Sequence, residues 1–277
     1  MTQVTAGFPA MGIMPTRIGD RGLAMRSRGH IGVFAALALL TGLSAPAAAL
    51  TSSEVTVGVK QNMHATLLTP EGKGPYPGIL LLHTSSGLKP ADLEYGRALA
   101  QQGYVVLVPA FMDAYGLTAV TRAGTFTTDA EPIYADLAAA LDMLEHQPQV
   151  AGSKLGAIGF SNGGYFAMWL AATNKVQAGV SYYGALTGAA TDKELSRFRA
   201  VFNKNSAPVL VMHGSSDSTV PVAAANRMSA ILAAAGSPHE VNIYDGAGHS
   251  FERLPGSESA AADAWQRTLA FYAKYLK

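Results

Sequence analysis

The chain has 277 residues, of which 49% are hydrophobic and 14% are charged, and these values fit one globular α/β domain rather than two. Its 29 glycines and low charge argue against a disordered protein and against a coiled coil. The net charge of +1 provides no basic surface for nucleic acid. The chain has no cysteine, which excludes disulfide bonds and thiolate metal sites.

The first 49 residues have the pattern of a secretory signal peptide. Two arginines precede an apolar run over residues 31–43, and the small residues that signal peptidase prefers end at Ala49. The run is too short to span a bilayer comfortably. We therefore predict an exported protein, periplasmic or secreted, that begins at Leu50 and has no membrane contact after cleavage. The alternative is an uncleaved anchor. The stretch before Met25 is long for a signal, which favours a translation start at Met25.

Residues 50–277 are expected to form a single domain in which strands and helices alternate. The predicted strands are 54–60, 63–69, 78–83, 104–109, 154–158, 176–183, 207–213 and 240–244, and the helices are 90–102, 131–146, 165–172, 222–235 and 257–276. Two antiparallel strands followed by β-α units predict the α/β class, with a mostly parallel, doubly wound sheet and helices on both faces. Residues 111–128 form a long irregular stretch, which is typical of a functional loop, and residues 187–205 form an excursion with some helix.

The motif Gly159-Phe160-Ser161-Asn162-Gly163 lies between a predicted strand and a predicted helix, as a nucleophile elbow requires. A serine at such a sharp turn has a strained backbone, and the residues two before and two after it must be small. The turn lifts the Ser161 hydroxyl clear of the sheet and aims the first helix amides at the group under attack. The alternative is a glycine-rich turn with an incidental serine.

Two residues that could activate Ser161 follow later strands, at the sheet edge where ligands of such folds lie. Asp217 follows the seventh predicted strand and His249 follows the eighth, so the chain order is that of the α/β-hydrolase triad. His249 would take the proton of Ser161, and Asp217 would hold the imidazole in the correct tautomer. Asp245 is an alternative acid that ranks below Asp217. Asp217 could also merely cap the next helix, and His249 could be an ordinary loop histidine.

An acyl-transfer site also needs an oxyanion hole made of backbone N–H groups. The elbow supplies the N–H of Asn162, and the loop after the third predicted strand should supply the second, from Thr84 or, as the next choice, Ser85. His83 and His213 each end a strand, and we interpret both as strand-end polar groups rather than catalytic residues.

These motifs together resemble the dienelactone hydrolase family of α/β-hydrolases over roughly residues 55–277. The stretches that carry the resemblance are 77–111, the elbow, the loop 213–221 and the run 246–253. The resemblance implies hydrolysis of a small ester or lactone without a cofactor or metal ion. Members proper have a cysteine nucleophile where this chain has Ser161, and a glutamate where it has Thr84. We therefore expect a serine esterase of the same family.

The resemblance also implies a substrate site. The family's arginine that matches Arg253, four residues after His249, binds the substrate carboxylate, and a guanidinium suits that role because its planar fork matches a carboxylate. Ser85 and Phe251 complete the expected substrate-binding set. The alternative is that Arg253 is a solvated residue near the start of the last helix.

The sequence thus predicts an exported serine hydrolase that acts on small-molecule esters or lactones through an acyl-serine. One alternative is an acyl-peptide or amide hydrolase, because the triad does not choose between ester and amide. Another is a non-catalytic binding protein on a hydrolase scaffold, against which the complete set of three residues argues. The sequence does not indicate the oligomeric state.

Overall fold

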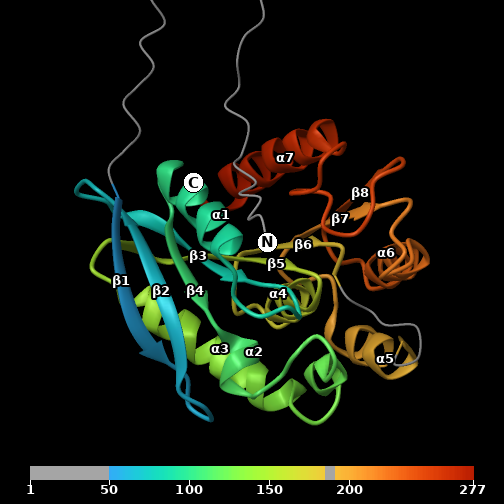
Figure 1. The fold of residues 1–277 in the computed structure, drawn as a ribbon, viewed down its shortest axis with the longest axis horizontal. Coiled ribbons are helices and arrows are strands. Elements are labelled where there is room, and N and C mark those ends of the chain that lie inside the picture. The colour runs from blue at the N-terminus through green and yellow to red at the C-terminus, as the bar shows by residue number, and fades with distance from the viewer. Residues whose placement is uncertain (1–49, 185–190) are drawn as a thin grey trace, which may run out of the picture. The chain divides into compact units, whose positions relative to one another are not determined.

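A computed structural model describes residues 50–184 and 191–277 (Figure 1). The predicted signal peptide lies outside the described residues, as does part of the excursion predicted over residues 187–205. Within the described ranges, no helix has the length and apolar character needed to cross a membrane.

The described residues form one eight-stranded sheet, in the order β1-β2-β4-β3-β5-β6-β7-β8. β1 pairs antiparallel with β2, β2 pairs antiparallel with β4, and the other neighbours are parallel. The strands are β1 (Leu50–Val57), β2 (Met63–Pro70), β3 (Tyr76–Leu82), β4 (Val105–Pro109), β5 (Val150–Phe160), β6 (Ala178–Tyr182), β7 (Val209–Gly214) and β8 (His239–Tyr244). The predicted mostly parallel sheet is confirmed.

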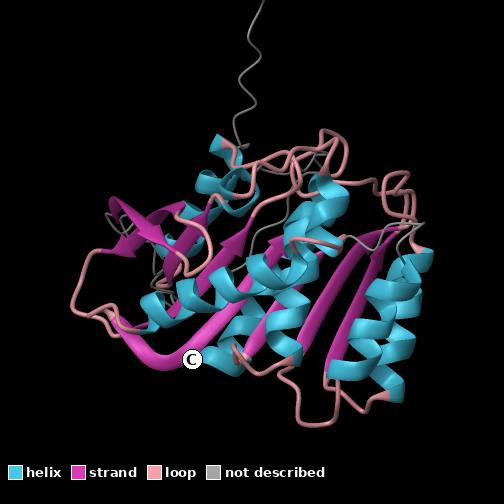
Figure 2. Cartoon of the chain, turned by 90° about the horizontal axis from the view of Figure 1, so that it is seen from below, coloured by secondary structure: helices cyan, strands magenta, loops and turns pink. Residues whose placement is uncertain are grey.

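Helices cover both faces of this sheet, as predicted, and Figure 2 shows them packed along the strands. The helices are α1 (Pro90–Gln101), α2 (Phe111–Ala114), α3 (Ala130–Glu145), α4 (Asn162–Ala172), α5 (Thr191–Val201), α6 (Ala223–Ala234) and α7 (Glu258–Leu276), and η1 (Arg122–Phe126) is a 3₁₀ helix. Successive side chains of a strand point to opposite faces. In β3, Leu80 and Leu82 therefore join the core under α3, α4 and α6, whereas Ile79 and Leu81 join the core under α1 and α7.

The structure corrects several predicted boundaries. β1 begins at Leu50, four residues before its predicted start, and β6 covers Ala178–Tyr182 rather than residues 176–183. The first strand ends at Val57 rather than at residue 60, because Gly58 turns the chain with a φ of 116°. β5 begins at Val150, four residues before the predicted start, because its first half is polar and carries no apolar pattern. The irregular stretch 111–128 contains α2 and η1, and helices this short are invisible to a periodicity argument.

Asp136, fully buried on α3, ties the β1–β2 turn and the chain after α2 to this helix. Its carboxylate accepts hydrogen bonds from the backbone N–H groups of residues 59, 60 and 61, at 2.6, 2.5 and 2.9 Å, and from the Tyr115 hydroxyl at 2.6 Å. Burial opposes the charge, but these bonds outweigh it and hold the pKa of Asp136 below its ordinary value.

We predict that Asp136→Ala lowers the free energy of unfolding at pH 7 by about 2–4 kcal/mol, because it leaves several donors without their charged acceptor. Since the pKa is lower in the folded state, the stabilisation is present above the unfolded pKa of about 3.9 and is lost as the pH falls through the folded value. Urea unfolding of the wild type and the variant between pH 7 and pH 3 measures this. A stability difference that stays constant below pH 4 would contradict it.

Candidate active site

Ser161 lies at the junction of β5 and α4, in a backbone conformation that side chains rarely adopt. Its φ is 53° and its ψ is −115°, and α4 begins at the next residue. The positive φ is costly for any residue with a Cβ, and such strain is concentrated at functional sites. The strained elbow expected from the motif is therefore present.

The two glycines of the motif are required by backbone contacts. A Cβ added to Gly159 would lie 2.1 Å from the backbone of Gly163, and a Cβ added to Gly163 would lie 2.2 Å from the carbonyl oxygen of Leu82. Real Cβ atoms do not approach backbone atoms this closely. The absence of side chains thus lets α4 pack against the end of β3, which brings the loop after β3 beside Ser161.

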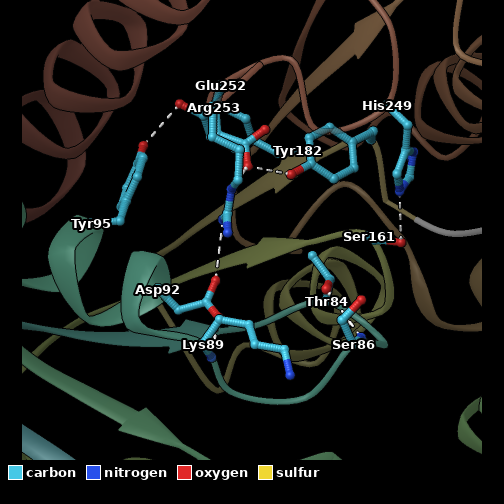
Figure 3. A network of polar contacts seen from close by, with 11 residues as sticks. Thr84, Ser86, Lys89, Asp92, Tyr95, Ser161, Tyr182, His249, Glu252 and Arg253 are labelled. Atoms are coloured by element: carbon cyan, nitrogen blue, oxygen red, sulfur yellow. Dashed lines mark hydrogen bonds and ion pairs between the residues drawn. The ribbon is translucent and has the colours of Figure 1, made fainter. Parts of the chain in front are cut away.

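The structure brings Ser161, His249 and Asp217 into one chain of hydrogen bonds. Figure 3 shows the link between Ser161 and His249. His249 Nε2 lies 3.2 Å from Ser161 Oγ, and His249 Nδ1 lies 2.7 Å from Asp217 Oδ2. A carboxylate only accepts, so Nδ1 carries the proton and Nε2 is free to accept the serine hydroxyl. Asp245, the alternative acid, instead accepts a hydrogen bond from Ser215 at 3.1 Å.

The Asp217 carboxylate holds both the local turn and the histidine. Its Oδ1 accepts the backbone N–H groups of Thr219 and Val220, each at 2.8 Å, while Oδ2 accepts His249. Burial alone would raise the pKa of Asp217, but the bonds from His249 and from these amides hold it below its ordinary value. Asp217 can therefore hold the backbone before the next helix and bind His249 at the same time, so the two interpretations of this residue do not exclude each other.

His213, interpreted from the sequence as a strand-end polar group, lies beside the triad acid. Its Nε2 is 2.8 Å from the carbonyl oxygen of Val220 and 3.4 Å from Asp217 Oδ2. Because both neighbours are acceptors, Nε2 carries a proton. Burial lowers the pKa of His213, which favours a neutral ring. The hydrogen bond of His213 holds the turn that follows Asp217, a contact that its position at the end of β7 did not indicate.

A cavity of about 210 Å³ opens over Ser161 and His249. The residues that line it are Thr84, Ser85, Ser86, Ala119, Arg122, Ser161, Thr219, Val220, His249 and Ser250. Three of them come from the loop after β3, where the second oxyanion donor was expected. Asn162, the first expected donor, begins α4 and is buried next to Ser161. Among the described side chains, no group of three His, Asp or Glu could hold a metal ion.

Ala119 and Arg122 show that the chain between α2 and α3 reaches the site. The side-chain amide of Asn162 donates from Nδ2 to Thr125 Oγ1 at 2.8 Å and thereby ties η1 to the elbow. Sequence reasoning singled out this stretch as a functional loop but did not identify Arg122. The available signal was an arginine inside a long irregular stretch, which by itself does not distinguish a site residue from a surface one.

The structure does not bring Arg253 or Phe251 to the cavity. The Arg253 guanidinium is bonded to Asp92 Oδ1 at 3.1 Å and to Glu252 Oε1 at 2.6 Å (Figure 3). Phe251 is fully buried, and its ring packs on those of Tyr182 and Tyr244. Of the expected substrate-binding residues, the cavity is lined by Ser85 alone.

A serine raised on a strand-to-helix elbow, with an acid and a base that follow later strands of the same parallel sheet, is the arrangement of the α/β-hydrolases, and this chain has their fold. Within that class it belongs to the dienelactone hydrolase family, whose sequence profile matches residues 63–276.

Relatives in this family agree with that assignment. A Methylorubrum extorquens protein provisionally named carboxymethylenebutenolidase is 29% identical over 251 residues, which cover 86% of each chain. The carboxymethylenebutenolidase of Rhodococcus opacus is 31% identical over 72% of this chain and 81% of its own. The crystal structure of dienelactone hydrolase from Anabaena variabilis is 25% identical, with a TM-score of 0.61 over 82% of this chain and 99% of the other. The protein is a hydrolase that acts on lactones or esters.

We predict that Gly163→Ala destabilises the protein by about 3 kcal/mol or more, because the new methyl group meets the backbone of β3 rather than a movable side chain. Gly248→Ala is the matched control, since a Cβ there meets nothing within 4 Å. It should change stability by less than about 0.5 kcal/mol. Urea unfolding measures both variants, and equal losses would show that the elbow contact is not the cause.

Proposed function

We propose that the protein cleaves small-molecule esters or lactones through an acyl-serine intermediate on Ser161. The observation that carries the proposal is the continuous hydrogen-bond chain from Ser161 through His249 to Asp217. A serine hydroxyl is a weak nucleophile at its own pKa, so acyl transfer requires an adjacent base. Nε2 of His249 lies at the distance from which it could accept the hydroxyl proton.

The reaction would proceed by a double displacement. As His249 takes the proton, Ser161 Oγ attacks the carbonyl carbon, and the resulting oxyanion accepts hydrogen bonds from the N–H groups of Asn162 and Thr84. His249 then delivers its proton to the leaving alkoxide, and a water molecule activated by the same imidazole hydrolyses the acyl-serine. Asp217, held ionised by its hydrogen bonds, stabilises the imidazolium formed in each half-reaction.

We predict that Ser161→Ala and His249→Ala each lower kcat on 4-nitrophenyl acetate by roughly 10⁴-fold or more. The double variant should be little worse than either single one, because the two residues act as a unit. Fully additive losses would show that they are not partners. Melting temperatures near that of the wild type would show that the variants remain folded.

A fluorophosphonate probe distinguishes the proposal from the non-catalytic alternative. It phosphonylates an activated serine, and mass spectrometry locates the modified residue. Labelling of Ser161 in the wild type, and its absence in His249→Ala, supports the acyl-serine route. A wild type that does not label supports a binding protein on a hydrolase scaffold.

We further propose that the preferred substrate carries a negative charge and that Arg122 binds the charged group. Arg122 is one of the residues that line the cavity, and its guanidinium donates to the Ala119 carbonyl at 2.9 Å. Among the described residues, no carboxylate lies within ion-pairing distance of Arg122, and no acidic side chain lines the cavity. Arg253, by contrast, is already neutralised by two carboxylates.

We predict that Arg122→Ala lowers kcat/KM for an ester with a free carboxylate by roughly 3- to 30-fold, since Arg122 is exposed and its bond is screened by water. The neutral methyl ester of the same compound should be nearly unaffected. Arg253→Ala is the matched control, and its effect should be the same on both substrates. If Arg253→Ala lowers kcat/KM for the acidic ester only, and Arg122→Ala does not, then Arg253 and not Arg122 binds the substrate carboxylate.

We also propose that the protein is exported to the periplasm or medium and that its mature chain begins at Leu50. The support is the basic, apolar and small-residue order of the leader. N-terminal sequencing of protein expressed from the full chain should find Leu50 first. Full-length protein retained in the membrane fraction would instead favour the uncleaved anchor.

A further inference from the structure

Tyr183, the residue after β6, touches the proposed base directly. The centroid of its ring lies 4.4 Å from that of the His249 imidazole, at an interplanar angle of 55°. The side chain is completely buried, so it is not available to a substrate. The proposed double displacement does not use this contact between Tyr183 and His249.

The backbone of Tyr183 is held in an unfavourable conformation. Its φ is 39°, a value that is a genuine outlier for a bulky residue. The non-glycine residues with positive φ in the described chain are Ser161, Asn174, Tyr183 and Ser250. Three of these lie at the site: the nucleophile, the residue against the base, and the residue after the base. Strain of this kind persists where the surrounding structure over-determines a position.

The hydroxyl of Tyr183 is anchored by a buried ion-pair network. It donates to Glu252 Oε1 at 2.6 Å, and the same oxygen accepts from Arg253 Nε at 2.6 Å. Arg253 also donates to Asp92 Oδ1 at 3.1 Å, at the start of α1, as Figure 3 shows. The ring against His249 is therefore connected through Glu252 and Arg253 to Asp92 of α1.

Glu252 has a feature that stability alone does not explain. Its side chain is buried, and its Oε2 has no hydrogen-bond partner among the described residues. A partly satisfied buried carboxylate is costly, and a well-packed apolar residue would often serve stability better. Burial and the charge of Glu252 raise the pKa of Tyr183 well above its ordinary value, so the hydroxyl stays protonated and remains a donor.

We propose that Tyr183 is a positioning residue for His249 and that Glu252, itself held by Arg253, fixes Tyr183 in place. The ring lies against the imidazole and limits its rotation away from the line between Ser161 and Asp217. Its π-face also favours the positive charge that the imidazole gains during proton transfer. The inference rests on the proposed function, because it takes His249 as the base. It gives Arg253 a role through Glu252 and Tyr183 rather than through contact with substrate.

The test compares the rate of Ser161 labelling by a fluorophosphonate with kcat and KM for 4-nitrophenyl acetate. Tyr183→Leu removes both ring and hydroxyl, and we expect labelling rate and kcat to fall together by roughly 10- to 100-fold, because a small displacement of a catalytic group is sufficient. KM should stay within about twofold, since the ring does not line the cavity. Tyr183→Phe keeps the ring but loses the bond to Glu252, so its loss should be only roughly 3- to 10-fold, as in Glu252→Leu.

The hydrogen bond from Tyr183 to Glu252 is tested at Glu252. These variants test the proposal even if Tyr183→Leu does not fold. Glu252→Leu removes the acceptor of the Tyr183 hydroxyl and should slow labelling by roughly 3- to 10-fold, whereas Glu252→Gln keeps an acceptor oxygen and should restore most of the rate. Tyr272→Phe is the control, because it removes a buried hydroxyl that donates to the Ala157 carbonyl at 2.9 Å, away from the site. It should label like the wild type.

The outcomes separate this inference from the proposed function. A folded Tyr183→Leu variant that labels as fast as the wild type, or a Glu252→Leu variant as fast as Glu252→Gln, overturns the positioning role while the proposed function stands. A wild type that does not label overturns the proposed function and, with it, this inference.

Discussion

The close approach of three backbone segments at the elbow is the constraint on which the rest of the site depends. Gly159, Gly163 and the end of β3 meet at distances that leave no room for a Cβ. Because α4 can then start directly beside β3, the loop after β3 lines the same cavity as Ser161, and the first residue of the helix follows Ser161 directly. Backbone packing thus places the proposed oxyanion donors near the proposed nucleophile, before any side-chain interaction is considered.

The proposed base and acid, His249 and Asp217, are held in a different way, by polar side-chain contacts. Asp217 receives hydrogen bonds from His249 and from two backbone amides, and His213 lies nearby with its proton directed at the same turn. These donors keep the carboxylate ionised although it is buried. The ring of Tyr183 also contacts the imidazole of His249. The imidazole therefore has polar contacts at both nitrogens and an apolar contact against its ring.

The two arginines near the site differ because of their neighbours. Arg253 lies over the ring of Phe160 and is bonded to Glu252 and Asp92, so its charge is neutralised within the fold. Arg122 has a carbonyl oxygen as its contact and faces the cavity. A guanidinium can recognise an anionic substrate only if its charge is not already paired, and this condition favours Arg122.

The sequence by itself determined the sheet class, the elbow and the order of the three triad residues, because these depend on local pattern and on the rule that strand ends share one edge. The spacing of apolar residues and the need for small residues around Ser161 involve only a few neighbouring positions, so both are visible in the sequence. The tertiary structure alone decided which charges are paired: Arg253 is four residues from His249, yet Asp92 from α1 neutralises it. It also decided that Phe251 is buried, that Arg122 lines the cavity and that Tyr183 contacts His249, since pairing and burial depend on residues far apart in the sequence.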